Sequence, residues 1–310
     1  MIDIIEQEIM NMSEKLFNML LKDKTTNKNI CWATDLYISY GEKYYPQEPI
    51  TKELITGINT KIIRPRVAKA MEEQSIRTKD KAEVFTPSWV CNEQNNLIDE
   101  SWFGRKDVFN KSIEKSWITN KEKIVFPKNK SWKKYVDDKR LEISCGEAPY
   151  LVSRYDSVSG KEIPIEERIG LLDRKLRVIN ENTFLEDEWF EQVKRAYEST
   201  YGYEYQGDNL LIARENLFYT FIENMEYKFG HRPDEKQMQA IANIISWNIW
   251  QMAGITMNVP YSERTRGNTQ ISIFEILNNI DTSKKEPIPC KIFDWRANKS
   301  IEFKSMLNKK

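Results

Sequence analysis

The sequence predicts an α/β fold with a parallel sheet, a helical and loop-rich N-terminal extension over residues 1–76 and a helical insertion over residues 157–199. Two short apolar runs, Arg140–Ser144 and Tyr201–Glu204, have the length of buried strands, and each is followed by a turn and a helical pattern. Strands that alternate with helices are typical of parallel sheets, because each helix carries the chain back across the sheet. We therefore expect the α/β domain to occupy residues 77–310.

Helical periodicity accounts for most of the chain that follows the first strand. Inside the insertion, Glu167–Val178 and Glu186–Glu198 carry apolar residues at helical spacing. The second strand precedes a helical run over Leu210–Phe221, and another helix contains Met238 to Ile245. Near the end of the chain, Cys290–Trp295 is predicted to be a short strand with an acid near its tip.

Composition and charge limit the class of protein. The chain has 310 residues, 40% hydrophobic and 12% aromatic, which suffices for a buried core and excludes a disordered or collagen-like chain. Lys+Arg and Asp+Glu both total 47, so the formal net charge is zero. No overall field attracts the chain to nucleic acid, and affinity for DNA must come from a local basic patch.

Two local clusters are candidates for such a patch. The run from Arg64 to Lys81 is rich in basic residues, and lysines at positions 128, 130, 133 and 134 surround Trp132. Basic side chains interleaved with aromatic rings can contact the phosphates of nucleic acid. The alternative is an ordinary solvated surface.

Targeting and metal signals are missing from the sequence. Residues 1–22 alternate charged and apolar side chains, which predicts an amphipathic helix and not the apolar core of a signal peptide. No stretch approaches the roughly 20 apolar residues of a membrane helix. The four cysteines form no CxxC pair, and His231 cannot complete a zinc set with the usual spacing. We expect a soluble, cytoplasmic protein without a membrane span or a bound metal.

The most informative segment is Glu142-Ile143-Ser144-Cys145-Gly146, which lies between the first strand and a helical stretch containing Tyr150–Val152. A glycine at a strand-to-helix turn allows a ligand to approach the backbone closely, although an ordinary turn also uses glycine. The sequence contains neither GxGxxG nor GxxxxGK[ST]. Their absence disfavours a dinucleotide site and a P-loop.

Three sequence elements, one around Gly146, one upstream of it and one downstream, resemble motifs of the adenine-N6 DNA methyltransferases. They resemble in particular the M subunits of restriction-modification systems. The segment from Glu142 to Gly146, with Tyr-Leu after it, is similar to the first S-adenosylmethionine (SAM) motif, (D/E)-P-x-C-G-x-G-x-F-L. Upstream, Ala82–Pro87 resembles the element G-x-(F/Y)-(F/Y)-T-P, which precedes that motif in the permuted order. Downstream, Tyr201–Glu204 and then Ala213–Leu217 resemble an acid followed by a helix reading A-(R/K)-x-N-L.

The resemblance implies a class I SAM-dependent methyltransferase-like, Rossmann-like sheet with SAM as cofactor, DNA as substrate and a role in restriction-modification or phage defence. Glu204 would accept hydrogen bonds from both ribose hydroxyls, with Asp173 as the competing acid. Phe85 and Thr86 would hold the amino-acid end of SAM, and Asn248 would contact its adenine. The full set of cofactor-binding candidates is Phe85, Thr86, Pro87, Glu142, Ser144, Cys145, Gly146, Glu204 and Asn248.

The chain also departs from the family pattern. Glu147-Ala148 replaces the second glycine, which places a carboxylate beside the ligand's own carboxylate. The tetrapeptide (N/D)-P-P-(Y/F), which holds the target amine and stacks the flipped base in the family, is absent. Two degenerate substitutes remain, and both can equally be ordinary loops. They provide the catalytic candidates Asn258 and Tyr261 in the first, and Asp294 and Trp295 in the second.

Three function classes follow. The first is a SAM-dependent DNA adenine-N6 methyltransferase-like protein, whose target recognition would come from the N-terminal region or a partner subunit because few residues follow Arg296. The second is a catalytically degenerate fold that binds SAM, a nucleotide or DNA as a regulatory or scaffold subunit. The third is an enzyme with the same pocket and a different nucleic-acid or nucleotide modification.

Overall fold

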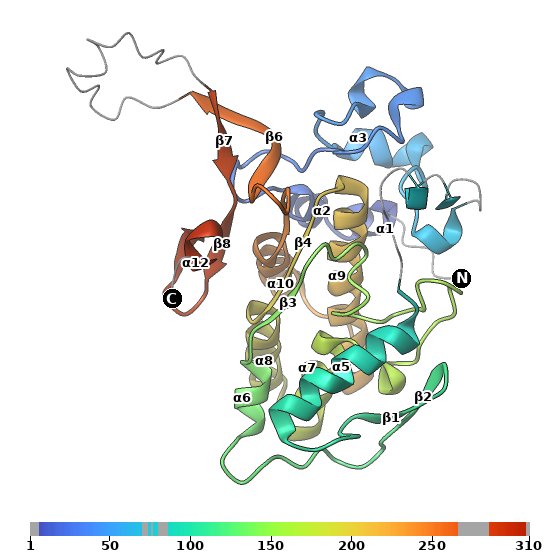
Figure 1. Ribbon diagram of the computed structural model, residues 1–310, viewed down its shortest axis with the longest axis vertical. Helices are drawn as coiled ribbons and strands as arrows, with labels where there is room; N and C mark the ends of the chain where they lie inside the picture. The colour runs from blue at the N-terminus through green and yellow to red at the C-terminus, as the bar shows by residue number, and fades with distance from the viewer. Residues whose placement is uncertain (1–5, 70–73, 76, 80–85, 266–284, 308–310) are drawn as a thin grey trace, which may run out of the picture.

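A parallel sheet of three strands lies at the centre of the computed structural model, which describes residues 6–69, 74–75, 77–79, 86–265 and 285–307 (Figure 1). Its order is β3-β4-β5, and Glu142 pairs with Gly202 while Glu204 pairs with Gln251. The predicted α/β class with a parallel sheet is therefore confirmed. The strands are β3 (Arg140–Glu142), β4 (Thr200–Glu204) and β5 (Ile249–Gln251).

Each connection between these strands contains a pair of long helices. They are α7 (Leu171–Asn182) and α8 (Glu186–Glu198) between β3 and β4, and α9 (Gly207–Phe229) and α10 (Glu235–Asn248) between β4 and β5. The first pair falls inside the predicted insertion, residues 157–199. Helix α10 begins at a capping box formed by Asp234 and Gln237, and α9 ends at Gly230 in the left-handed conformation with φ 76°.

The N-terminal segment packs against α9 and α10. Helices α1 (Glu6–Met12) and α2 (Glu14–Leu21) bury Leu16, Phe17 and Leu20 in the main core. The fully buried guanidinium of Arg214 donates hydrogen bonds to the carbonyls of Leu20 at 2.5 Å and Ile249 at 2.8 Å, which joins the end of α2 to β5. Short turns follow, namely η1 (Ile38–Tyr40), η2 (Glu42–Tyr44), α3 (Lys52–Ile55), η3 (Gly57–Asn59) and η4 (Arg66–Ala68).

A buried charge cluster fixes the first turn of α9. The Asp208 carboxylate accepts hydrogen bonds from Arg77 and from the Tyr37 hydroxyl, both at 2.8 Å, and lies 3.7 Å from the Lys69 ammonium. Burial alone would raise the pKa of Asp208, but the charges of Arg77 and Lys69 together with these hydrogen bonds lower it to about 2. Arg77 and Lys69 belong to the predicted basic run, and because both are buried here they do not form a surface for phosphates.

A further group of elements lies in the lower part of the view in Figure 1, around α5, β1 and β2. It consists of α5 (Ser88–Phe103), the hairpin β1 (Asn110–Ile113) and β2 (Ser116–Thr119), α6 (Trp132–Val136) and η5 (Ile165–Glu167). The buried pair Arg174 and Asp99, 2.5 Å apart, joins α7 to α5. Lys130, in the other predicted basic cluster, lies over the ring of Trp102 with its ammonium 4.5 Å from the centroid.

The C-terminal part of the described chain forms two antiparallel hairpins beside the sheet (Figure 1). The first is β6 (Asn258–Thr265) with β7 (Lys285–Pro289), and the second is β8 (Lys291–Asp294) with β9 (Lys299–Glu302), followed by α12 (Lys304–Leu307). The predicted strand near Asp294 is therefore present. It pairs with β9 and lies outside the parallel sheet.

One local expectation differs from the structure. The stretch containing Tyr150–Val152 forms turns and no helix, because Ala148 adopts a left-handed conformation with φ 64° that interrupts helical geometry. The four cysteines, Cys31, Cys91, Cys145 and Cys290, are free and buried. Among the helices in the described ranges, none has the length and apolar content needed to cross a bilayer.

Candidate functional site

The carboxyl ends of β3 and β4 open into a cavity of about 700 Å³. Ligands of open parallel sheets bind at this end of the strands, where loops and helix N-termini converge. The structure brings a large part of the predicted site together here. The predicted residues that line the cavity are Thr86, Glu142, Ser144, Cys145, Gly146, Glu204 and Tyr261.

Glu204, the last residue of β4, is held in place by backbone hydrogen bonds. Its carboxylate accepts from the Gly146 amide at 2.8 Å and from the Gln206 amide at 3.1 Å. A carboxylate offers about four acceptor positions, and the Tyr205 amide also donates to this one, so one position remains for a ligand. Burial raises the pKa of Glu204, while these backbone donors oppose the rise. The predicted pairing of a strand-end acid with the glycine turn is thus present in the geometry.

Glu142, at the end of β3, is a second acid in the same cavity. Its Oε1 accepts a long hydrogen bond of 3.4 Å from the Tyr150 amide, and its Oε2 has no hydrogen-bond partner among the described residues. Burial, with a smaller contribution from Glu204, raises the pKa of Glu142 well above its usual range. A ligand that donates hydrogen bonds would satisfy the unpaired oxygen.

The loop after β3 follows an unusual path. Ser144, Gly146 and Ala148 all adopt left-handed conformations, with φ of 48°, 52° and 64°. Strained non-glycine residues cluster at ligand-binding turns, and here they direct the Gly146 amide at Glu204. Glu147 points away from the cavity and accepts from the Arg66 amide and the Tyr155 hydroxyl. Glu147 therefore does not lie beside a ligand in this cavity, and the expected repulsion from the ligand's carboxylate does not arise.

The upstream element reaches the cavity through Thr86, which lines it. The Thr86 carbonyl accepts from the Ser157 hydroxyl at 2.8 Å. Pro87 lies just behind it as the N-cap of α5 and does not line the cavity. Phe85 lies outside the described residues.

Sequence reasoning missed the wall that the N-terminal segment provides. Thr34 and Asp35 line the cavity because the Gly207 amide donates to the Trp32 carbonyl at 2.9 Å and brings this segment to the start of α9. The run Asn29–Asp35 ends in polar residues, but no local pattern links it to β4. The other missed lining residues are Ala33, Pro46, Pro149, Tyr150, Tyr205, Gln206 and Asn209.

The charge of the lining is one-sided. Glu142 and Glu204 line the cavity, and the described part of its wall contains no Lys or Arg. Beside the unpaired Glu142 oxygen, the Thr34 hydroxyl and Gln206 Oε1 also have no hydrogen-bond partner among the described residues. The site therefore favours a ligand with several hydrogen-bond donors.

Only the aromatic member of the first degenerate catalytic motif reaches this cavity. Tyr261 lines it with φ 51° and a side chain that is 58% exposed. Asn258 pairs with Pro289 in the β6–β7 hairpin and does not line the cavity. The bulge between positions 258 and 263 separates the two side chains.

The structure keeps Asp294, Trp295 and Asn248 away from the cavity. The Trp295 indole donates to Asn248 Oδ1 at 2.9 Å, and the Asn248 amide donates to the carbonyls of Tyr197 and Thr200. Thr200 begins β4 and Glu204 ends it, so this group lies about 13 Å away along the strand. Asn248 thus holds the amino end of β4, and Asp294 caps its own turn by accepting from Ala297 at 3.0 Å.

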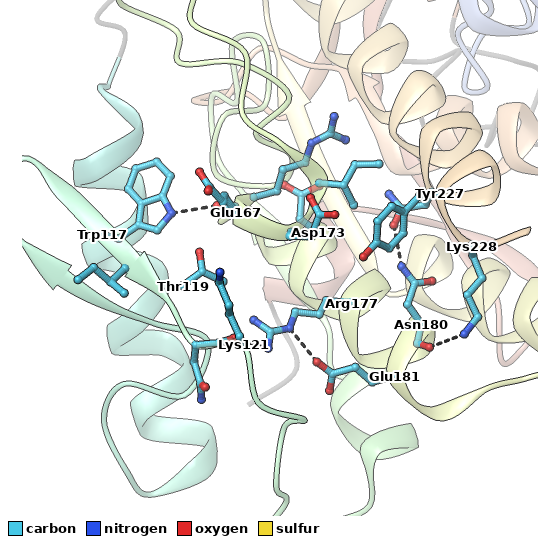
Figure 2. Close-up of a pocket in the computed structure, with 16 residues that line it drawn as sticks. Trp117, Thr119, Lys121, Glu167, Asp173, Arg177, Asn180, Glu181, Tyr227 and Lys228 are labelled. Atoms are coloured by element: carbon cyan, nitrogen blue, oxygen red, sulfur yellow. Dashed lines mark hydrogen bonds and ion pairs between the residues drawn. The ribbon is translucent and has the colours of Figure 1, made fainter. Parts of the chain in front are cut away.

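Asp173, the competing ribose acid, faces a different cavity (Figure 2). Its Oδ2 accepts from the Ser153 amide at 2.8 Å and the Gly170 amide at 3.1 Å, which caps α7. Glu204 is consequently the acid that accompanies Gly146. Comparisons of this chain with protein-family models, with curated proteins and with solved structures found no match.

Proposed function

We propose that the cavity at the carboxyl ends of β3 and β4 binds SAM, and that the protein is a DNA adenine-N6 methyltransferase-like protein of a restriction-modification or phage-defence system. The observation that carries the proposal is the buried Glu204 carboxylate, which is fixed by the Gly146 amide and retains acceptor capacity towards the cavity. A ribose hydroxyl matches that capacity.

The unpaired acceptors of the cavity fit the remaining donors of SAM. Glu142 Oε2 and Gln206 Oε1 require donors, and SAM offers an ammonium group and an adenine amino group. Thr86 and Ser144 line the cavity near the glycine turn and can contact the amino-acid end. When bound, SAM supplies an electrophilic methyl group; the residues of this chain would position it.

The acidic lining distinguishes SAM from a nucleotide. SAM carries a sulfonium and an ammonium against one carboxylate, whereas a nucleotide brings phosphate charges beside Glu204 to a wall whose described part holds no Lys or Arg. Bringing like charges together in a buried site is unfavourable. The proposal therefore favours SAM over ATP or a dinucleotide.

DNA as substrate, and a partner subunit that supplies target recognition, rest on the resemblance. The described wall of the cavity offers no cationic side chain to a phosphate, so phosphate contacts must come from elsewhere on the protein or from that partner. Binding to DNA should accordingly be measured with and without candidate partner subunits.

A second candidate function is a SAM-binding regulatory or scaffold subunit that transfers no methyl group. It is favoured by the placement of Asp294 at the amino end of the sheet and of Asn258 outside the cavity wall. Neither the amide of Asn258 nor the acid of Asp294 is then in place to orient the target amine. Tyr261 alone provides a stacking surface.

Calorimetric titration with SAM tests the cofactor site. We expect SAM to bind the full chain, and Glu204→Ala to weaken binding at least about tenfold because a charge-assisted hydrogen bond is lost. Glu302→Ala, the same change at an exposed position on β9, should leave the affinity unchanged. ATP should bind more weakly than SAM. Equal affinity of the wild type and a folded Glu204→Ala variant, as judged by its melting curve, would contradict the proposal.

Transfer of a labelled methyl group from SAM to adenine-containing DNA separates the two candidates. The first candidate predicts labelling of DNA above the level of the Glu204→Ala variant, lost in Tyr261→Ala and retained in Asp294→Ala because only Tyr261 of these two lines the cavity. The second candidate predicts that the chain binds SAM and labels no DNA.

A further inference from the structure

A cluster of basic side chains lies where the carboxyl end of α5 meets α6. The segments 104–106 and 128–134 hold six cations and no acid, and all of the six except Lys130 are exposed. The nearest exposed acids along the chain are Asp107 and Glu122, so positive charge is in excess. We call these six residues the α5–α6 cluster: Arg105, Lys106, Lys128, Lys130, Lys133 and Lys134.

Packing holds the two segments of the α5–α6 cluster together. The centroid of the Trp102 ring, at the end of α5, lies 5.1 Å from the centroid of the Tyr135 ring of α6. The Lys130 ammonium lies 4.5 Å from the centroid of Trp102 and donates a hydrogen bond to the carbonyl of the same residue. Arg105 donates to the Val125 carbonyl at 3.1 Å. These contacts bring the six cations to one region of the surface.

Most of this charge is not neutralised within the protein. Two members of the α5–α6 cluster have acidic neighbours, Lys106 at 3.9 Å from Glu100 and Lys133 at 4.0 Å from Glu188. Exposed pairs at such distances contribute little. The other four members make no ion pair with a carboxylate in the described part of the chain. The cluster therefore retains positive charge for an external partner.

Helix α5 connects the α5–α6 cluster with the proposed SAM cavity. Thr86, which lines the cavity, and Pro87, the N-cap of α5, lie at one end of the helix, and 104–106 follow its other end. The 16 residues of this helix span about 24 Å. Base pairs of B-DNA are about 3.4 Å apart along the axis, so this distance corresponds to about seven base pairs. A duplex that runs alongside α5 can reach both places.

We propose that the α5–α6 cluster binds the phosphate backbone of duplex DNA about seven base pairs from the base that enters the SAM cavity. The cavity wall offers no Lys or Arg among its described residues, so the cluster supplies phosphate contacts that the cavity does not. Lysine and arginine that contact phosphates release condensed counterions, which favours binding of a polyanion. The seven-base-pair register rests on the proposed function, whereas the backbone contact does not.

The tryptophans beside the cluster indicate a duplex and not a single strand. Single-stranded nucleic acid is held by aromatic rings on which successive bases stack. Trp102 and Trp132 are partly buried, and an ammonium group lies over each ring, that of Lys130 over Trp102 and that of Lys133 at 5.3 Å from the centroid of Trp132. These rings position cations and offer little free face to a base. Recognition of the backbone alone is what a duplex requires.

Fluorescence anisotropy with a labelled duplex of about 20 base pairs tests the backbone contact in the absence of SAM. The double variant Lys128→Ala/Lys134→Ala should weaken binding about tenfold and reduce the slope of log K against log salt by about two, because two phosphate contacts are lost. Lys28→Ala, at an exposed lysine of the N-terminal segment, should change neither quantity. If the double variant binds as tightly as Lys28→Ala, the cluster does not contact DNA.

Crosslinking from the cluster measures the register. The four native cysteines are buried, so Lys128→Cys provides one exposed thiol for a photoreactive label. A mismatched base costs least to extrude, and a duplex with one mismatched adenine therefore fixes the position of the target. With SAM present, crosslinks should be centred about seven base pairs from that mismatch. Crosslinks spread evenly along the duplex would overturn the register.

Competition distinguishes duplex DNA from other polyanions. Vesicles of phosphatidylserine and phosphatidylcholine at the same total phosphate should leave the duplex bound, and displacement by them would instead assign the cluster to a membrane surface. A single strand of the same length should compete less well than the duplex. Tighter binding of the single strand would overturn the choice of duplex.

DNA binding and SAM binding can fail independently of each other. DNA binding that depends on Lys128 and Lys134 in a chain without affinity for SAM would refute the cofactor site and support the backbone contact. SAM binding without any dependence of DNA binding on these two lysines would support the cofactor site and refute the backbone contact.

Discussion

Asp208→Ala is expected to lower the free energy of unfolding by about 3–5 kcal/mol at pH 7, because it leaves buried cations without their counter-charge. Asp208 is fully buried, and its carboxylate lies 2.8 Å from Arg77 and 3.7 Å from Lys69. Urea denaturation measures the change. Asp187→Ala, at an exposed position in the first turn of α8, should cost only about 0.5 kcal/mol.

The same carboxylate predicts a pH dependence. Its pKa is lowered from 3.8 to about 2 in the folded protein, so the folded state favours the ionised form. The resulting stabilisation is complete above the unfolded pKa and is lost as the pH falls through the folded pKa. The difference in unfolding free energy between wild type and Asp208→Ala should therefore shrink between pH 4 and pH 2. A constant difference across this range would contradict the assignment.

Gly207→Ala is expected to destabilise the protein by about 3 kcal/mol or more, since no small side-chain movement can make room for the methyl group. A Cβ at this position would lie 2.0 Å from the Cys31 carbonyl oxygen and 2.9 Å from its carbon. The backbone of the N-terminal segment must then move away from α9. Because Thr34 and Asp35 line the SAM cavity, SAM affinity should fall as well.

Gly230→Ala provides the matched control for this substitution. Gly230 has φ 76°, and a Cβ added there would meet no described atom within 4 Å, so alanine costs only the left-handed backbone conformation, about 1 kcal/mol. Melting temperatures and limited proteolysis near residue 31 distinguish the two effects. If Gly207→Ala melts no earlier than Gly230→Ala, the close contact with Cys31 is not limiting.

The sequence predicts those parts of the site that depend on local pattern. Strand length and helical periodicity place Gly146 after one parallel strand and Glu204 at the end of the next, and parallel strands end at the same edge of the sheet. The contact between these two residues follows from that rule. Tyr261 is indicated only by its match to the aromatic position of a degenerate motif.

Contacts between distant segments account for what the sequence does not predict. Asp294 lies on a predicted strand that exists, but β8 pairs with β9 and not with the parallel sheet, and strand pairing leaves no local signal. Asn248 is fixed by carbonyls of Tyr197 and Thr200, which belong to other elements. Thr34 reaches the cavity for the same reason. Its neighbours in space are far away along the chain.

The N-terminal segment also sets the order in which this chain can finish folding. The Cys31 amide donates to the Gln251 side chain at 2.9 Å, across 220 residues of sequence. At ribosomal rates of about 5–20 residues per second, residue 251 emerges roughly 10–40 s after residue 31. Until α9 and α10 have been synthesised, the apolar faces of α1 and α2 have no helix to pack against. The N-terminal segment can therefore complete its contact with β5 only after most of the chain has been synthesised.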